Sequence, residues 1–140
     1  AGWCEASATL TLLLERGCQS DVRHINSVVS ACARGKQWRC ASIVLSAIVR
    51  NNISADTISY NATISACDKG AEWQRALVLL ITMERAELLA DTISYTTAIS
   101  ACEKCVEWRE PLSLLATMDH LVIEPNNISY NAAISACEKG

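Results

Sequence analysis

The chain has 140 residues, about the length of one ordinary domain, which excludes a large multidomain enzyme within this sequence. Hydrophobic residues make up 51% of it and charged residues 19%, a balance typical of globular rather than disordered proteins. The formal net charge of −3 argues against an indiscriminate polybasic phosphate binder, although it is compatible with a locally basic groove.

A repeat of 35 residues runs through the whole sequence. Each of the four tryptophans lies 35 residues after the one before it, and one series of four cysteines keeps the same spacing. These residues are Trp3, Trp38, Trp73 and Trp108, and Cys32, Cys67, Cys102 and Cys137. Self-similarity at a fixed period of this length is typical of repeat architectures, in which stacked units share one continuous core.

In chain order, the array consists of a partial unit, three complete units and a second partial unit. The partial unit at 1–21 carries a second helix, the complete units are Val22–Asp56, Thr57–Asp91 and Thr92–Asn126, and the partial unit at 127–140 carries a first helix. Both ends interrupt a repeat, so we expect this single array to be a piece of a longer one.

Each complete unit is predicted to form two amphipathic helices. In the second complete unit, Tyr60, Ile64 and Cys67 fall on one helical face. Gly70 follows, and a glycine in the left-handed conformation is a common helix stop. The next helix carries one apolar stripe that starts at Trp73, so the fold class predicted is all-α.

The second helix of the third complete unit contains a proline. Pro111 takes the place of Ala41 and Ala76, and proline crowds the preceding helical turn unless it lies in the first turn. We therefore predict this hairpin to be the least stable complete unit. The tryptophans of all units share the stripe of the core leucines, so we expect them to be buried or half-buried.

These helical hairpins resemble pentatricopeptide repeats in period, helix boundaries and opening residues. The matching motifs are Thr57-Ile-Ser-Tyr-Asn, Ile64-Ser-Ala-Cys-Asp-Lys-Gly and Glu72-Trp-Gln-Arg-Ala-Leu. The tryptophan in each unit and the proline-free endings at Asp56 and Asp91 depart from the family and indicate a divergent branch. The tetratricopeptide repeat fits worse, because its period is about 34 residues and its Trp…Leu-Gly…Tyr pattern is absent. The resemblance implies a right-handed α-solenoid of helix-turn-helix repeats.

The resemblance also implies sequence-specific binding of single-stranded RNA, about one nucleotide per repeat. The family selects bases with the fifth and last residues of each repeat, which here are Asn26 with Asp56, Asn61 with Asp91, and Thr96 with Asn126. In the family's code Asn with Asp favours uracil and Thr with Asn favours adenine. The complete units therefore predict U-U-A, followed by a pyrimidine that Asn131, the fifth residue of the partial repeat at 127–140, suggests.

Two further columns of residues match family positions that contact RNA. The second residues of the last three repeats, Ile58, Ile93 and Ile128, correspond to those that clamp each base, whereas Arg23 departs from this pattern in the first complete unit. Cations recur at the ends of the first helices as Arg34, Lys69, Lys104 and Lys139, and the family's matching lysine contacts phosphates. The alternative is that these cations only stabilise helix C-termini, by about 0.3–1 kcal/mol each at exposed sites.

The sequence contains no motif that predicts catalysis, a metal site or a cofactor. The repeating cysteines are expected to be small core residues, because equivalent stacked helices lie too far apart for a disulfide. Cys102 and Cys105 match a CxxC motif, but Cys105 only replaces the glycine that ends the other first helices. His24 and His120 do not share a repeat position, and phosphate loops and hydrolase motifs are absent.

The sequence itself gives no compartment. Ala1–Ser20 lacks the pattern of a secretory signal, no apolar run is long enough to span a membrane, and the family resemblance alone implies a mitochondrion or chloroplast. The function expected is RNA binding in organellar RNA processing, stability or editing, by a protein that is not an enzyme. The alternative is an α-solenoid scaffold whose concave face binds a protein partner.

Overall fold

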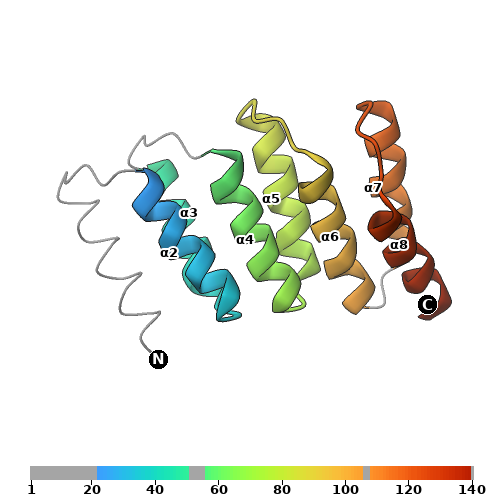
Figure 1. Ribbon diagram of the computed structural model, residues 1–140, viewed down its shortest axis with the longest axis horizontal. Helices are drawn as coiled ribbons and strands as arrows, with labels where there is room; N and C mark the ends of the chain where they lie inside the picture. Colours follow the sequence, from blue (N-terminus) through green and yellow to red (C-terminus); the bar gives the residue numbers. More distant parts are fainter. Residues whose placement is uncertain (1–21, 51–55, 106–107, 140) are drawn as a thin grey trace.

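The computed structural model describes residues 22–50, 56–105 and 108–139, so the partial unit predicted at 1–21 lies outside them. These residues form seven helices, α2 (Val22–Arg34), α3 (Trp38–Arg50), α4 (Thr57–Lys69), α5 (Trp73–Arg85), α6 (Thr92–Lys104), α7 (Arg109–His120) and α8 (Asn127–Lys139). The helices follow one another side by side in chain order (Figure 1). The prediction of an all-α solenoid of helical hairpins is confirmed.

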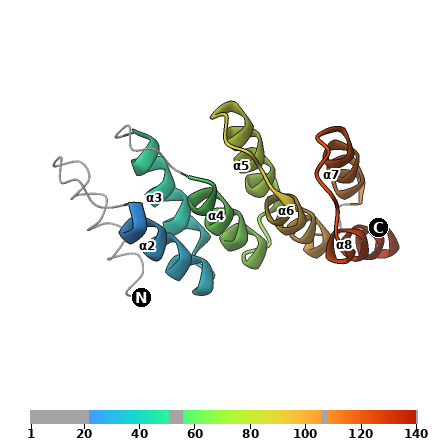
Figure 2. The same ribbon diagram turned by 45° about the horizontal axis from the view of Figure 1, so that its top comes forward.

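The solenoid has two layers of helices (Figure 2). The first helices α2, α4, α6 and α8 contact one another in sequence, whereas no α-carbon of α3 lies within 8 Å of α5, and none of α5 within 8 Å of α7. The first helices bury small residues such as Ala66, Ala98, Ala101 and Ala133, which let the helices approach closely. The second helices lie further apart than the first helices, so their layer is more open.

The core lies between the layers and follows the predicted helix faces. Tyr60, Ile64 and Cys67 are buried on α4, and Leu80 and Met83 are buried on α5. Burying a side chain of this size contributes about 1.5–3 kcal/mol, and each unit repeats the pattern. The amphipathic faces predicted from helical spacing are therefore confirmed for this hairpin.

The predicted left-handed glycine at the helix stop is wrong. Gly70 has φ −89°, and the left-handed residue is the next one, Ala71, with φ 56°. Ala71 N–H bonds the Asp68 carbonyl at 3.1 Å and Glu72 N–H bonds that of Cys67 at 2.8 Å, which is a Schellman motif one residue further along. The same positive φ falls on Lys36, Glu87 and Val122.

Replacing Val122 with glycine should stabilise the protein. Val122 has φ 58° and is 89% exposed, so it has left-handed strain without a packing contribution to lose. Relief of about 1–2 kcal/mol, partly offset by the greater chain entropy of glycine, should raise the Tm by a few degrees. Val49→Gly is the matched control, because Val49 is exposed within α3, and it should lower the Tm in the same thermal melts. A lower Tm for Val122→Gly would contradict the expectation.

Pro111 shortens its helix without interrupting it. α3 and α5 begin at their tryptophans, where Ala41 and Ala76 N–H groups bond the carbonyls four residues before them. Proline cannot make this bond, and α7 begins one residue later, which leaves Pro111 in its first turn. The crowding considered for a helix interior therefore does not arise.

The tryptophans do not occupy equivalent sites. Trp38 and Trp73 are half-buried against the core, whereas Trp108 is 41% exposed, and Trp3 lies outside the described residues. The expectation of equal burial is thus wrong for Trp108, which precedes the shortened α7 instead of opening it. The Trp38 ring lies against Gly70 of the next hairpin, where a Cβ would approach its Cδ1 to 2.4 Å.

Candidate functional site

The candidate site is built on the N-termini of the first helices. Asp56 and Asp91 cap α4 and α6, and each carboxylate accepts a backbone N–H bond of 2.9 Å, from Ser59 and Ser94 respectively. Asn126 accepts the equivalent bond from Ser129 N–H at 2.9 Å. Such caps stabilise a helix by about 1 kcal/mol, so the last residue of each predicted unit is held by the start of the next helix.

The structure brings the predicted base-selecting residues together in pairs. Asn26 Nδ2 donates to Asp56 Oδ2 at 3.2 Å, and Asn61 Nδ2 donates to Asp91 Oδ1 at 3.4 Å. Thr96 reaches its partner through one serine, because its hydroxyl lies 2.6 Å from Ser129 Oγ, which donates to Asn126 Oδ1 at 2.9 Å. Asn131 is exposed on α8, and no described residue pairs with it.

Three serines that the sequence reasoning missed join these pairs. Ser59, Ser94 and Ser129 are fully buried, and each hydroxyl bonds both the fifth residue of the preceding unit and its own capping residue. Ser94 Oγ, for example, lies 2.5 Å from Asn61 Oδ1 and 2.9 Å from Asp91 Oδ1. Their signal in the sequence was the 35-residue recurrence of Ile-Ser-Tyr.

These bonds leave different atoms available on the last residues of the units. Asp91 uses Oδ1 for its bonds and leaves Oδ2 as an acceptor, whereas Asn126 uses Oδ1 and leaves its amide N–H₂ as a donor within the described structure. Burial raises the pKa of Asp91, but bonds from Ser94 and Asn61 outweigh burial and lower it below its ordinary value. Asp56 shows the same net lowering, so both carboxylates are ionised at neutral pH.

The isoleucines at the second positions of the repeats expose their side chains to solvent. Ile58, Ile93 and Ile128 are 61%, 63% and 64% exposed, although the isoleucines at the core positions, Ile64 and Ile99, are fully buried. A large aliphatic side chain that is exposed in each of the units beginning at Thr57, Thr92 and Asn127 contributes little to the core. The three residues therefore form a regularly spaced apolar column beside the paired polar residues.

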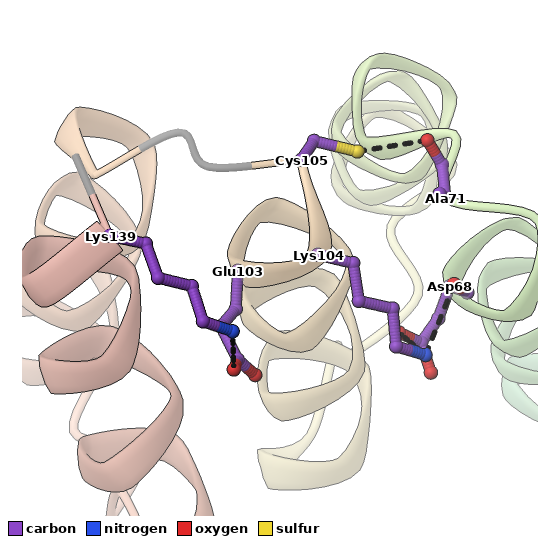
Figure 3. A network of polar contacts seen from close by, with 6 residues as sticks. All are labelled: Asp68, Ala71, Glu103, Lys104, Cys105 and Lys139. Carbon is purple, nitrogen blue, oxygen red and sulfur yellow. Dashed lines mark hydrogen bonds and ion pairs between the residues drawn. The ribbon is translucent and has the colours of Figure 1, made fainter.

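Two of the predicted phosphate-binding lysines are held in ion pairs between units (Figure 3). Lys104 Nζ lies 2.9 Å from Asp68 Oδ1, and Lys139 Nζ lies 2.9 Å from Glu103 Oε1. Bonds from Lys139 and Ser135 lower the pKa of Glu103. Lys69 is exposed, and no carboxylate is paired with it in the described structure. The residue of the preceding unit that corresponds to Asp68 is Ala33, which has no charge to offer. Arg34 is exposed at the end of α2.

The cysteines predicted as core residues differ in burial. Cys32, Cys67 and Cys102 are buried, but Cys137 is exposed, because no described helix packs over that side of α8. Cys105 is half-buried, and its thiol donates to the Ala71 carbonyl at 2.9 Å (Figure 3). The prediction of a core position is therefore wrong for Cys137.

Thiol labelling should follow this order of burial. Burial raises the pKa of Cys67 to about 11, so roughly one thiol in a thousand is ionised at pH 8, and only the thiolate reacts. We expect Cys137 to be alkylated fastest, Cys105 next and Cys67 slowest, by about a hundredfold. Mass spectrometry of iodoacetamide-treated protein measures the rates, with the urea-unfolded chain as the control. Equal labelling of Cys67 and Cys137 in the native protein would contradict this burial order.

Neither membrane-spanning helices nor metal clusters occur among the described residues. No helix there is long and apolar enough to cross a bilayer. The same residues include no group of three or more His, Cys, Asp and Glu side chains that could hold a metal ion.

Comparisons with known proteins connect this geometry with one family. The model of the pentatricopeptide repeat domain matches residues 12–69 and 78–139. The crystal structure of PPR10 from maize superposes with a TM-score of 0.77 at 21% identity, over 94% of this chain and 19% of that one. PPR10 in complex with an 18-nt psaJ RNA element gives a TM-score of 0.73 at 25% identity, over 89% of this chain and 18% of that one. The chain thus spans about a fifth of these proteins, and no curated protein matches it.

Proposed function

The chain belongs to the pentatricopeptide repeat family, and from this premise we propose that it binds single-stranded RNA at about one nucleotide per repeat. The observation that carries the proposal is the pairing of Asn26 with Asp56, Asn61 with Asp91, and Thr96 with Asn126. The complex of PPR10 with an RNA element, a structure 25% identical to this chain, supports the same class of ligand.

The atoms available in each pair account for the proposed base preference. An ionised last residue such as Asp91 only accepts hydrogen bonds, and it suits a base with a ring N–H on its Watson–Crick edge, namely uracil or guanine. The Asn126 amide donates instead, and it suits the ring acceptor of adenine or cytosine. The fifth residue then selects for size, since Asn reaches a pyrimidine and the shorter Thr leaves room for a purine. The three pairs together select U-U-A, and Asn131 adds a pyrimidine.

The exposed isoleucine column provides the second part of the proposed interface. Ile58, Ile93 and Ile128 lie beside the polar pairs and place aliphatic surface on both faces of the bases that the second and third complete units bind, whereas Arg23 takes this place on one face of the first base. Stacking of unpaired bases on protein side chains is common in single-strand recognition. We propose that this binding serves RNA processing, stability or editing in a mitochondrion or chloroplast, as the family resemblance implies.

Direct titration of the chain with labelled RNA tests the proposal. Single strands that contain U-U-A should bind more tightly than the same strands with C-C-G, and more tightly than duplexes, in fluorescence anisotropy at low salt. If single strands bind no better than duplexes while a peptide binds the isoleucine face, the chain is a scaffold and the proposal fails.

The cation column should contribute unequally to RNA affinity. Among the described residues no carboxylate pairs with Lys69, whereas Lys104 must leave Asp68 before it can reach a phosphate. Lys69→Gln should therefore reduce the affinity for every RNA sequence. It should also make the slope of log K against log salt concentration shallower by about 0.7, the value for one phosphate contact on a single strand. Lys104→Gln should change both quantities less. Titrations at several salt concentrations measure both slopes, and a larger effect of Lys104→Gln would contradict this order.

A further inference from the structure

A groove of about 690 Å³ lies between α3 and α5 in the second-helix layer. No α-carbon of α3 lies within 8 Å of α5 across this groove, whereas the first helices α2 and α4 contact each other. Leu45, Val49, Val78 and Leu79 line it, and Val49 and Val78 are 52% and 60% exposed. Exposed apolar surface that is contiguous and bordered by polar residues marks an interaction site.

Three arginines give this groove a positive border. Arg50 and Arg75 line it and also line an adjoining hollow of about 390 Å³, together with Arg39. The residues lining the two hollows include no carboxylate. The guanidinium groups of Arg39 and Arg75 lie 5.1 and 4.6 Å from the centre of the Trp38 ring, which holds them in place. The groove is therefore positive although the chain has a net charge of −3.

The tyrosine at the bottom of the groove lacks the partner that its repeat equivalent has. Tyr95 donates its hydroxyl proton to Glu84 Oε1 at 2.7 Å. Tyr60 is the equivalent of Tyr95 one repeat earlier, and Val49 takes the place of Glu84 there. Tyr60 is 2% exposed and lines the groove, and its hydroxyl makes no such bond to a described residue. The Tyr60 hydroxyl is thus one of the uncharged polar groups that the groove offers to a ligand, together with Ser42, Ser46, Gln74 and Thr82.

The equivalent residues between α5 and α7 differ in the features that define this groove. Glu110 replaces Arg75, Glu84 replaces Val49, and Ser113 replaces Val78, each at a distance of 35 residues. The repeat fold itself therefore does not require arginines and valines at these places. Their combination distinguishes the α3–α5 groove from its neighbour in the same array.

We propose that the α3–α5 groove binds an amphipathic helix of a partner protein, with an apolar stripe flanked by acidic residues. Two helices form its walls and aliphatic side chains its floor, which suits the apolar face of a third helix. Arg39, Arg50 and Arg75 complement carboxylates along the edges of that helix. An RNA strand fits less well, because none of the residues that line the groove belongs to the base-selecting pairs. The base-selecting pairs lie on the first helices, so the groove is a second site.

Titration of the 140-residue chain with labelled synthetic peptides tests this site. The probe is a helical peptide of about 16 residues with leucines at i, i+3, i+4 and i+7 and glutamates on both flanks, and its control carries lysines for the glutamates. The acidic peptide should bind at least about tenfold more tightly than the basic one in fluorescence anisotropy. Equal binding of the two peptides, or no binding of either, overturns the proposal.

Variants of the chain locate the binding. Arg75→Glu and Val78→Glu should each weaken the acidic peptide at least about tenfold, and Val78 is exposed, so its change does not disturb folding. Arg85→Glu is the matched control, since Arg85 lies 35 residues after Arg50 and lines neither hollow, and it should leave binding unchanged. If both groove variants abolish RNA binding and leave peptide binding intact, the groove is a phosphate surface and the proposal fails. Loss of base preference with intact peptide binding would instead contradict only the RNA function.

Discussion

Asn61→Thr should move the preferred base at one nucleotide from uracil to guanine. The variant keeps Asp91, whose carboxylate accepts the ring N–H of either base, and replaces the longer amide by a short hydroxyl that leaves room for a purine. Thr96 supplies the precedent, because its hydroxyl already contacts the serine of its own pair, Ser129. The wrong base should cost about 1–3 kcal/mol, or about 5- to 150-fold in affinity.

The measurement uses the three complete units grafted into a longer array, because additional bound nucleotides raise the affinity and make single-base differences easier to resolve. Binding is then compared for RNAs that differ only at the second nucleotide of U-U-A. The matched control is Asn26→Thr, which should change preference at the first nucleotide and leave the second unchanged. A loss of affinity that is equal for all four bases would contradict base selection by Asn61.

Gly70→Ala should destabilise the protein through a clash between neighbouring hairpins. The new Cβ would lie 2.4 Å from Trp38 Cδ1, and Trp38 cannot shift freely, because it packs against the core and between Arg39 and Arg75. Overpacking of this kind costs about 1–3 kcal/mol, whereas loss of chain entropy in the unfolded state returns about 0.4–1 kcal/mol. The net effect of about 1–2 kcal/mol should lower the Tm by several degrees.

A double-mutant cycle separates the clash from other effects of the substitution. In a Trp38→Leu background the ring is absent, so adding Gly70→Ala should be neutral or slightly stabilising. Gly70 has a negative φ, so backbone conformation does not require glycine there. If Gly70→Ala is equally destabilising with and without Trp38, the contact between the two residues is not the cause.

Periodicity in the sequence was sufficient to predict the hairpins and the residues that face the core. Tyr60, Ile64 and Cys67 were placed on one face by their spacing, and this face is buried because it meets the same face of the next unit. The pairing of Asn61 with Asp91 followed from family positions, and the structure adds the buried Ser94 that joins them. A serine in the first turn of a helix can cap the helix, bond its own backbone or face solvent. The recurrence of serine in the sequence therefore did not predict that Ser94 joins the two paired residues.

Other features depend on offsets between units that local sequence does not contain. Lys104 pairs with Asp68, which is 36 residues away, rather than with its chain neighbour Glu103, because stacking brings successive helix ends together. Glycine at a helix end suggested the left-handed position, but Gly70 lies close to the Trp38 ring with a negative φ, and Ala71 takes the positive φ. The lysine pairing and the close approach at Gly70 are contacts between hairpins, whereas the positive φ of Ala71 belongs to the Schellman motif of its own helix end.

Selection from a randomised RNA pool tests the central claim most directly. The three complete units, grafted into an array of known specificity, are allowed to select single strands with random bases opposite them. The account predicts enrichment of U-U-A in 5′ to 3′ order from the N-terminal to the C-terminal unit, with guanine replacing the second uracil for Asn61→Thr. Enrichment of no sequence opposite these units, or of one that Asn61→Thr leaves unchanged, would contradict it.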